Sequence, residues 1–438
     1  MSKKLDMKSQ IEVFKFGGAS IKDAEGIRNV GRILQEHRHQ SLVIVVSAMG
    51  KTTNALEKVV EAHAAQDGQA QGLLDDLKKQ HYLVAQELLG NEHEVFALLN
   101  DTFVEVDWVL EEPPHDNYDY MYDQIVPAGE LAASRIVLAY LNAIDLPTQY
   151  LDARDIILTD DIFREGWVQW EETVARARRQ VPPLLEQGGF VLTQGFIGST
   201  TENFSITLGR EGSDYTAAIF SFCLDAQSMT IWKDVPGVLT GDPRVFKNVV
   251  KLDRLSYREA IEMTYYGAKV IHPKTIKPLQ NKSIPLYVKS FLDPTGTGTL
   301  ITSDVDDTYP SIVSLEKEQA LLQVSTRDFS FVAEHHMSYL FNIIAELRLQ
   351  VNLMQNSAIN FNICVNDIDD KVDLFAQKIS ENFNVLIDRD LELITVRHAQ
   401  PDLLDSLRRG KLVLLEERHR GTVQMVVKDV PVMERMSS

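Results

Sequence analysis

The feature that most constrains the fold is the order of segments at the start of the sequence. Residues 11–16, IEVFKF, predict a strand that ends at Gly17-Gly18. Apolar residues then recur at helical spacing as far as residue 34, and residues 42–47, LVIVVS, form a nearly continuous apolar run. Such a run is typical of a strand that is buried on both faces of a parallel sheet. Strand, glycine turn, helix and buried strand together predict a βαβ unit and therefore an α/β fold.

The alternation of strands and helices continues, with one long helical excursion, through the first two thirds of the sequence. Residues 53–110 are rich in Ala, Leu, Glu, Lys and Gln and predict helices that leave the sheet, and another helix is predicted over 130–141. Ser20 is the predicted N-cap of the first helix. Three more apolar segments predict strands: 148–151, 190–193 and 229–232. We therefore expect a mostly parallel sheet between helices in residues 1–300.

The pattern changes after a turn-rich, acidic stretch, and residues 301–315 are the predicted linker. Residues 359–365 then alternate apolar and polar side chains, as a half-buried antiparallel strand does. Helices are predicted at 371–383 and 401–409. Further strands are predicted at 320–325, at 391–396 and, as a hairpin, at 412–427. This mixture is typical of small α+β modules with helices on one sheet face, so we expect a pair of them in residues 316–438, the second one shortened.

Composition and charge argue against several classes of function. Lysine and arginine total 44 against 63 acidic residues, so the formal net charge is −19, and nucleic acids and anionic membranes are repelled. The two cysteines, Cys223 and Cys364, provide neither a disulfide scaffold nor a cysteine zinc site. The N-terminus lacks the apolar segment of a secretory signal, and no run approaches the roughly 18 apolar residues of a membrane span. We expect a cytoplasmic protein that binds neither nucleic acid nor membrane.

The first candidate site follows from Lys15, which leaves the first strand just before Gly17 and Gly18. Glycines at this place allow backbone amides to approach an oligophosphate, and the N-terminus of the following helix adds partial positive charge. The segment matches neither the dinucleotide-binding fingerprint nor the P-loop pattern. Taken alone, it is equally compatible with a tight structural turn.

A second candidate site lies in residues 207–218, where glycines flank Arg210 and a helix begins at Ser213-Asp214. The planar guanidinium of Arg210 suits a substrate carboxylate, Ser213 adds a hydrogen-bond donor, and Asp214 can accept from a substrate ammonium. The alternative is a helix cap beside a surface ion pair. That alternative explains any one of these residues better than it explains the whole cluster.

A third candidate site is the turn-rich segment 232–244, which follows an apolar strand and so lies where open α/β sheets bind ligands. Lys233 and Arg244 are candidates for binding phosphates, and Asp234 is a candidate for orienting a nucleotide or a hydrated metal ion. Lys269 adds one more cation further along the chain. For each cation taken singly, a solvated surface position is the alternative.

Together these segments resemble the aspartate kinases of the amino-acid kinase superfamily, whose pattern has KFGGTS, TLGRGGSDYTA and WTDVDGVYTADPR. The motifs stand here as KFGGAS (15–20), TLGREGSDYTA (207–217) and WKDVPGVLTGDPR (232–244). Three shorter segments match in the same order: VSAMGKTTN (46–54), PAGE (127–130) and GAKVIHP (267–273). The resemblance covers residues 11–300, and the tail resembles the family's paired, ferredoxin-like ACT modules. It implies an amino-acid kinase fold followed by a regulatory region.

The resemblance also implies an activity, which is ATP-dependent phosphorylation of the β-carboxylate of L-aspartate. Mg²⁺ would bridge phosphate oxygens, and no metal site formed by the protein itself is implied. The residues implied in catalysis are Lys15, Arg210 and Asp234. The implied aspartate pocket contains Ser47, Thr53, Glu130, Arg210, Ser213 and Asp214. The implied ATP side contains Lys15, Gly17, Gly18, Lys233, Asp234, Arg244 and Lys269.

Three departures from the family pattern concern substrate and nucleotide binding. Glu211 replaces a glycine and places an anion next to Arg210, Leu239 replaces a tyrosine, and Lys233 replaces a threonine. Two rival functions stay open: a related kinase that acts on glutamate, acetylglutamate or UMP, and an amino-acid sensor whose kinase site has decayed. The cluster around Arg210 and the long tail argue against the first rival, and the retained Lys15 argues against the second.

The ACT resemblance implies a homodimer that pairs through the C-terminal modules and binds an amino-acid effector at the joint. The candidate effector residues lie in the first module: Ser338, Asn352, Asn356 and Ser357. Lysine-responsive relatives tend to carry an aspartate at the position of Asn352, where it is a natural partner for a ligand ammonium. The neutral amide weakens the case for lysine, so lysine and threonine both stay open as effectors.

Overall fold

The computed structural model describes residues 10–268, 271–303, 305, 308–327, 331 and 333–430. The chain forms two compact units. The first unit takes its residues from 1–238, 251–261 and 271–306, and the second from 239–250, 262–270 and 307–438. Two short stretches from the middle of the sequence therefore belong to the same unit as the C-terminal region. The linker at 301–315 and the domain limits 1–300 and 316–438 remain predictions from the sequence.

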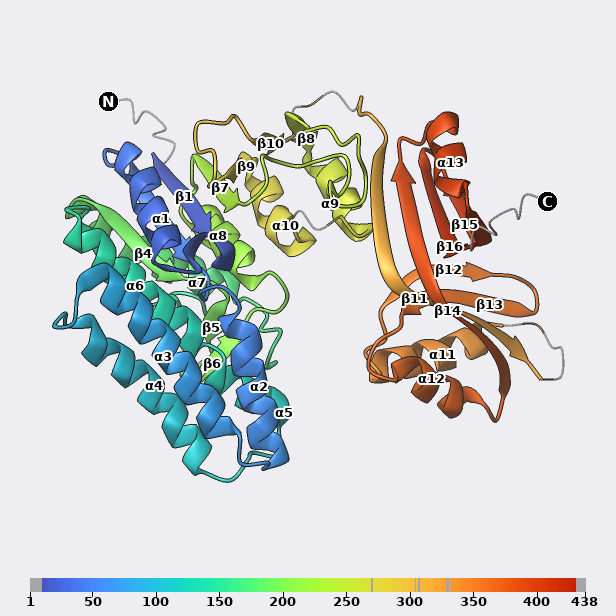
Figure 1. Ribbon diagram of the computed structural model, residues 1–438, viewed down its shortest axis with the longest axis horizontal. Coiled ribbons are helices and arrows are strands. Elements are labelled where there is room, and N and C mark those ends of the chain that lie inside the picture. Colours follow the sequence, from blue (N-terminus) through green and yellow to red (C-terminus); the bar gives the residue numbers. More distant parts are fainter. Residues whose placement is uncertain are drawn as a thin grey trace, which may run out of the picture. The chain divides into compact units, whose positions relative to one another are not determined.

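The first unit is built on an eight-stranded sheet with the strand order β3-β4-β2-β1-β7-β9-β10-β8 (Figure 1). Neighbouring strands are parallel except for the antiparallel pair β9-β10. The strands are β1 (Ile11–Phe16), β2 (Ser41–Val46), β3 (Thr148–Leu151), β4 (Phe190–Gln194), β7 (Ser228–Lys233), β8 (Arg254–Ser256), β9 (Leu286–Ser290) and β10 (Thr299–Thr302). A separate antiparallel hairpin consists of β5 (Ile197–Ser199) and β6 (Ser205–Thr207). The predicted, mostly parallel α/β sheet is confirmed.

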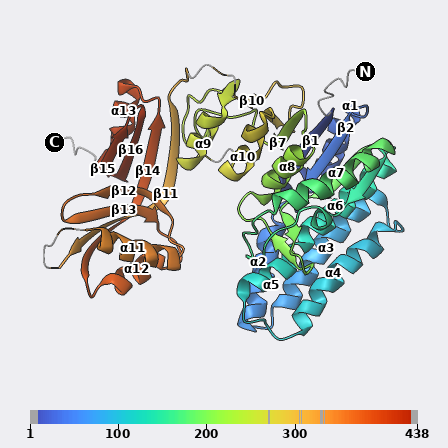
Figure 2. The ribbon, with the colours of Figure 1, turned by 180° about the vertical axis from the view of Figure 1, so that it is seen from behind.

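Helices cover both faces of this sheet (Figures 1 and 2). Phe14 and Phe16 of β1 and Ile44 and Val46 of β2 share one core with helices α1 to α4 and α6. Side chains alternate along a strand, so the alternate residues of β1 and β2 point to the opposite face of the sheet. That face is covered by α8, which contacts β1, β2 and β7. The helices are α1 (Ala24–Glu36), α2 (Thr52–Ala65), α3 (Ala70–Leu89), α4 (Val95–Glu111), α5 (Tyr118–Ile125), α6 (Ala128–Ala143), α7 (Trp170–Glu186), α8 (Gly212–Cys223), α9 (Tyr257–Tyr265, which contributes residues to both units) and α10 (Pro273–Lys282). The helical excursion predicted over 53–110 is the group α2, α3 and α4.

The start of α1 differs from the sequence prediction. Asp23, and not Ser20, is the N-cap, and its carboxylate accepts a hydrogen bond of 2.8 Å from the backbone N–H of Gly26. Ser20 lies one step earlier, in a 3₁₀ turn over Gly18–Ile21, where its hydroxyl donates to the Gly17 carbonyl at 2.6 Å. The prediction was wrong because this 3₁₀ turn separates the glycines from the helix.

The second unit is built on a six-stranded antiparallel sheet with the order β12-β13-β11-β14-β16-β15. Its strands are β11 (Ile312–Thr326), β12 (Val351–Asn356), β13 (Asn360–Asn366), β14 (Phe383–Arg397), β15 (Lys411–His419) and β16 (Thr422–Asp429). Its helices beyond α9 are α11 (Glu334–Glu346), α12 (Lys371–Ile379) and α13 (Pro401–Arg408). Helices α11 and α12 pack on one half of the sheet, and α13 packs on the other half. The predicted α+β architecture is confirmed.

The two halves of this second sheet share their central strands. β11 and β14 are each 15 residues long, more than twice the strands predicted at 320–325 and 391–396. Their pairing shifts register near Glu318, whose φ of 57° lies in the left-handed region. A bulge of this kind bends a strand without ending it, so one strand serves both halves.

The strand register in the first unit sets the place of the candidate site. Phe16 of β1 lies opposite Val46 of β2 and Trp232 of β7. The residues that follow these three strands therefore leave the sheet at the same edge, among them Gly17 and Ser47. The carboxyl edge of parallel strands is where open α/β sheets bind their ligands.

Candidate active site

Lys15 and Asp214 form the centre of the site. Lys15 is the fifth residue of β1, only 8% of it is exposed, and its Nζ lies 2.6 Å from Asp214 Oδ1 in the first turn of α8. The ammonium of Lys233, the last residue of β7, lies 3.8 Å from the other carboxylate oxygen. Desolvation alone would raise the pKa of Asp214, but the charges of Lys15 and Lys233 outweigh it and hold that pKa below its ordinary value. The site therefore contains two ammonium groups that share one buried carboxylate.

Gly18, the second glycine after β1, is required by close packing against the loop after β2. A Cβ on Gly18 would lie 2.8 Å from the carbonyl oxygen of Ala48 and 2.9 Å from that of Gly50. A Cβ on Gly17 would lie 3.3 Å from Lys15 Nζ. The backbone N–H of Gly50 donates to the Gly18 carbonyl at 3.0 Å, which joins the two loops directly. Larger side chains would push these loops apart.

Two of the three hydroxyl residues of the predicted aspartate pocket, Ser47 and Ser213, meet at the edge of the sheet. Ser47 Oγ donates to Ser213 Oγ at 2.9 Å, so the end of β2 touches the start of α8. Thr53 lies in the first turn of α2, a few residues after Ser47. A Cβ on Gly195 would lie 2.4 Å from the Cβ of Ser213, so that position accepts only glycine without a shift of α8. Gly195 thus packs closely against Ser213, and Ser213 in turn contacts Ser47 through their hydroxyls.

Glu130 brings a second buried carboxyl group to the site from the first turn of α6. One of its oxygens accepts from the backbone N–H of Ala48 at 3.3 Å, and the other, Oε2, is buried with no hydrogen-bond partner among the described residues. Desolvation raises the pKa of Glu130 to about 8, although the charge of Lys15 lowers it somewhat. A buried oxygen without a donor is an acceptor for a cationic group of a ligand.

Arg210 lies in the loop between β6 and α8, and its side chain is exposed. No ion pair of its guanidinium exists among the residues that the structure describes. Gly209 has a φ of +78°, and Glu211 also adopts the left-handed conformation, with φ 54° and ψ 29°. That conformation explains why a glycine is common at the position of Glu211. The loop presents Arg210 to solvent at the entrance to α8.

The carboxylate of Glu211 accepts a hydrogen bond at the start of α10. Its Oε2 accepts a hydrogen bond of 3.0 Å from the backbone N–H of His272, which is the N-cap of α10. Sequence reasoning treated Glu211 only as an anion next to Arg210. The structure adds a contact that ties the Arg210 loop to the start of α10, 61 residues further along the chain.

The predicted nucleotide-binding residues fall in three different places. Asp234 is exposed directly after β7, next to Lys233, in the first unit. Arg244 belongs to the second unit, where 84% of its side chain is exposed and it forms an ion pair of 2.7 Å with Asp242. Lys269 lies outside the described residues. Of the predicted ATP side, the structure thus places Lys15, Gly17, Gly18, Lys233 and Asp234 at one edge of the first sheet.

The predicted effector residues have different surroundings within the second unit. Asn352 donates to Gln319 Oε1 at 2.8 Å and to Asn366 Oδ1 at 2.6 Å, inside a cluster of side-chain amides. Ser357 instead closes the turn between β12 and β13. Ser338, in α11, and Asn356, at the end of β12, are exposed.

Sequence reasoning missed one buried carboxylate close to the Arg210 loop, that of Asp123 in α5. It is fully buried and accepts a hydrogen bond from the hydroxyl of Thr207, three residues before Arg210. Asp123 belongs to no motif, and a lone aspartate in a helix gives no signal in a single sequence. Its burial among apolar residues of α5 becomes visible only in the structure.

Two general properties of the described residues bear on function. No helix among them is long and apolar enough to cross a membrane. They contain no group of three or more His, Cys, Asp or Glu side chains arranged to hold a metal ion.

Comparisons with known proteins agree with this site. Residues 10–290 match the amino acid kinase family, and the chain belongs to that family. Its relatives within the family are aspartokinases, which confirms the resemblance seen in the motifs. It is 32% identical over 362 residues to the lysine-sensitive aspartokinase 3 of Escherichia coli, covering 80% of this chain and 77% of that one. It is 31% identical over 370 residues to the chloroplastic aspartokinase 1 of Arabidopsis thaliana, covering 82% of this chain and 64% of that one.

A solved structure extends the likeness to the whole described chain. The crystal structure of E. coli aspartokinase III in complex with aspartate and ADP matches with a TM-score of 0.82 and 25% sequence identity. The match covers 95% of this chain and 96% of that one. Both the α/β kinase fold and the antiparallel regulatory region are therefore shared with a known aspartokinase.

Proposed function

We propose that this chain transfers the γ-phosphoryl group of ATP to the β-carboxylate of L-aspartate. The products are ADP and 4-phospho-L-aspartate, and the reaction is the entry step to lysine, threonine and methionine. The observation that carries the proposal is the cluster of Lys15, Asp214 and Lys233 at the carboxyl edge of the parallel sheet, with the unpartnered oxygen of Glu130 beside it. The likeness to an aspartokinase described as bound to aspartate and ADP supports the same substrates.

The chemistry of the acceptor explains why the site needs cations and requires no general base. An aspartate β-carboxylate is ionised at neutral pH, so it attacks the phosphorus without losing a proton. Catalysis then consists of alignment and of stabilising the negative charge on the transferring phosphoryl group. Lys15 would stabilise that negative charge, because the ion pair with Asp214 fixes the place of its ammonium. Lys233, on the neighbouring strand, adds a second cation.

In the acceptor pocket, one residue would bind a carboxylate of the substrate and another would bind its ammonium. Arg210 would bind a carboxylate of aspartate through its planar fork, since it is exposed and has no ion-pair partner among the described residues. Glu130 would accept from the substrate ammonium through its unpartnered oxygen. Ser47 and Ser213, joined by their hydroxyls, would supply further hydrogen bonds, with Thr53 close in sequence. Asp214 is less suited to the ammonium because two lysines already engage it.

Mg²⁺ would enter with the nucleotide, because magnesium is usually held by phosphates, waters and one or two carboxylates. Asp234 fits such a role, since it is exposed next to Lys233 and makes no ion pair with any described residue. The ion would neutralise charge on the phosphates. Arg244 and Lys269 stay predicted contributors to the ATP side.

The direct experiment compares acceptors. ADP release is followed in a coupled assay with ATP and aspartate, with ATP and glutamate, and with ATP alone. The proposal predicts release that depends on aspartate. Release with glutamate at the same rate would support a related kinase of different specificity, and no release with any acceptor would support a decayed site.

We propose in addition that the second unit pairs with that of a second copy of the chain and binds an amino-acid effector. The support is the family resemblance of this region and the name of the lysine-sensitive E. coli relative. The amides around Asn352 are neutral and bonded to each other, which favours an effector other than lysine. Sedimentation of the full chain, together with activity titrations with lysine, threonine and methionine, tests both parts. A monomer, or flat titrations, would contradict the respective part.

A further inference from the structure

Asp123 joins three segments that are distant in the sequence. Its Oδ1 accepts a hydrogen bond of 2.7 Å from the Thr207 hydroxyl, and its Oδ2 accepts one of 2.8 Å from the backbone N–H of Arg164. The residue is 0% exposed, so no water competes for these oxygens. A buried carboxylate with one strong donor on each oxygen fixes the positions of both donors.

The strand held in this way leads directly to the acceptor side of the site. Thr207 is the last residue of β6, and only Leu208 and Gly209 separate it from Arg210. Its carbonyl accepts from the backbone N–H of Gly166 at 3.0 Å, so both its side chain and its backbone are tied to the same neighbourhood. With so short a connection, a shift of Thr207 moves Arg210.

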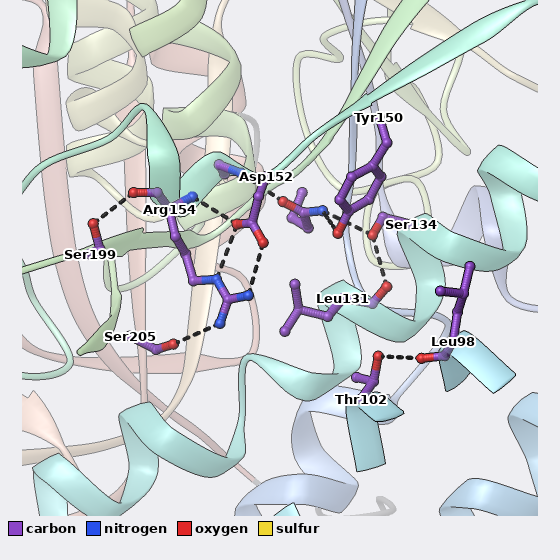
Figure 3. Close-up of polar contacts among 11 residues, drawn as sticks. Leu98, Thr102, Leu131, Ser134, Tyr150, Asp152, Arg154, Ser199 and Ser205 are labelled. Carbon is purple, nitrogen blue, oxygen red and sulfur yellow. Dashed lines mark hydrogen bonds and ion pairs between the residues drawn. The ribbon is translucent and has the colours of Figure 1, made fainter. Parts of the chain in front are cut away.

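Ser205, at the other end of β6, is held by two further contacts. The Gln124 side chain, next to Asp123 in α5, donates to the Ser205 carbonyl at 3.1 Å. Arg154 donates to the Ser205 hydroxyl at 3.2 Å, while Asp152 holds the same guanidinium (Figure 3). The strand before Arg210 is therefore anchored by α5 at both ends.

Arg164 contacts the other carboxylate oxygen of Asp123 through its backbone N–H. Its φ of +68° lies in the left-handed region, which is strained for a residue other than glycine. The hydrogen bond to Asp123 helps to hold this conformation. The Arg164 side chain is held as well, over the Tyr122 ring at 4.2 Å and 3.5 Å from Asp119. A Cβ on Gly209 would lie 3.4 Å from the Arg164 carbonyl oxygen, so this turn packs against the loop that carries Arg210.

We propose that Asp123 is a positioning residue for the acceptor: its contacts with Thr207 and Arg164 set the place from which Arg210 binds the substrate carboxylate. The inference rests on the proposed function, because it assumes that Arg210 binds aspartate. Asp123 itself touches no substrate in this account. Its effect reaches the reaction only through the short link from Thr207 to Arg210.

The substitution that isolates this role is Thr207→Val, which keeps the side-chain volume and removes the hydroxyl. It removes the hydroxyl that donates to the buried Asp123 Oδ1, and with it a contact that sets the place of Arg210. We expect the KM for aspartate to rise about tenfold, whereas the KM for ATP stays within about twofold. Thr207→Ser restores the hydroxyl and should return the aspartate KM close to wild type. Asp123→Asn should have an intermediate effect, because the Thr207 hydroxyl can turn round and accept from the new amide.

The matched control is Asp107→Asn, which removes a carboxylate from an ion pair of 2.7 Å with Lys78 in the helical excursion. It tests whether the loss of any well-formed polar contact in the first unit changes the aspartate KM. Equal changes in both KM values for Thr207→Val, or failure of Thr207→Ser to restore the wild-type value, would overturn the proposal. If Thr207→Val does not fold, the same comparison is made with Asp123→Asn.

A second measurement separates this proposal from the proposed function. Hydrogen exchange of the amides in residues 208–212 is measured without substrates, in the wild type, Thr207→Val and Asp107→Asn. We expect exchange to become at least several-fold faster in Thr207→Val alone. Unchanged exchange would overturn the positioning role even if the chain is an active aspartate kinase. Faster exchange in a chain without aspartate-dependent ADP release would support the anchoring of the loop and contradict the proposed function.

Discussion

The two units differ in the charge and in the hydrogen bonding of one polar cluster each. In the first unit, Lys15, Glu130 and Asp214 are charged or chargeable groups, and Glu130 keeps one oxygen without a partner. In the second unit, Asn352 and Gln319 belong to a cluster of neutral amides in which each side chain is bonded to another. The amide cluster lies on strands of its sheet, whereas in the first cluster only Lys15 lies on a strand, and Glu130 and Asp214 lie in the first turns of α6 and α8. Among the described residues, the first cluster contains a fully buried oxygen, Glu130 Oε2, that its own fold leaves without a hydrogen bond.

This difference separates a site that acts on a ligand from one that supports the fold. Burial of a charge or of an unpaired acceptor costs free energy, so such groups persist where a ligand offsets the cost. A cluster of neutral side chains that bond to one another stabilises the sheet without any ligand. The comparison therefore assigns chemistry to the first cluster and support of the sheet to the second. The following changes test that assignment, in order of decreasing effect.

The largest effect is expected for Lys15→Ala. It removes the ammonium that would stabilise charge on the transferring phosphoryl group, so kcat should fall by about 10²–10³-fold. The control is Lys78→Ala, which removes another lysine paired with an aspartate in the same unit and should leave kcat unchanged. Circular dichroism should show folded protein for both variants. A folded Lys15→Ala variant with nearly normal kcat would refute the role of Lys15.

Arg210→Lys keeps the charge and removes the planar fork. We expect the KM for aspartate to rise about tenfold and the KM for ATP to change little. Steady-state kinetics with each substrate varied in turn give both values. Equal increases for the two substrates would mean that Arg210 does not bind the acceptor carboxylate.

The pKa of Glu130 predicts how aspartate binding depends on pH. Burial raises that pKa to about 8, so at pH 7 the carboxyl is mostly protonated and binds an ammonium weakly. As pH rises from 7 to 9 the group ionises, and the KM for aspartate should fall several-fold, up to about tenfold. Glu130→Gln should have a higher KM that no longer varies with pH in this range. An unchanged pH dependence in that variant would assign the effect to another group.

Glu211 should have a small effect, because two consequences of its replacement oppose each other. Glu211→Gly relieves the left-handed conformation, which favours folding by on the order of 1 kcal/mol. It also loses the hydrogen bond from His272, which holds the Arg210 loop to α10. We expect the KM for aspartate to change by less than about threefold, with Glu211→Gln close to wild type. A large gain in aspartate affinity would show that the carboxylate repels the substrate.

Asn352→Asp should leave catalysis unchanged. The new charge has no cationic partner in the amide cluster, so the second unit should lose about 1–3 kcal/mol of stability. Thermal melts and effector-free kinetics measure the two quantities. A fall in kcat without unfolding would show that the amide cluster takes part in the reaction after all.

Much of the first unit can be predicted from local sequence patterns. The strand that ends in Lys15 and the glycines after it are visible because buried parallel strands are continuous apolar runs. The motif around Arg210 also keeps its family spacing. These features depend on residues close together in the chain, and single sequences report such features well.

The features that were missed depend on contacts between distant residues. The contact of Glu211 with His272 and the anchoring of Thr207 by Asp123 join segments more than 60 residues apart. The length of β11 was underestimated because Glu318 adopts a left-handed bulge that its residue type does not announce. The motif also did not indicate that the segment around Arg244 belongs to the second unit, and the place of Arg244 on the ATP side stays a prediction.

The most direct test of the central claim is to trap the product. Wild type and Lys15→Ala are incubated with ATP, Mg²⁺, hydroxylamine and either aspartate or glutamate, because hydroxylamine converts an acyl phosphate into a hydroxamate. The account predicts aspartyl hydroxamate in amounts equal to the ADP formed by the wild type, little with glutamate, and a loss of about 10²–10³-fold in rate with Lys15→Ala. ADP formation without hydroxamate, or full hydroxamate formation by Lys15→Ala, would contradict it.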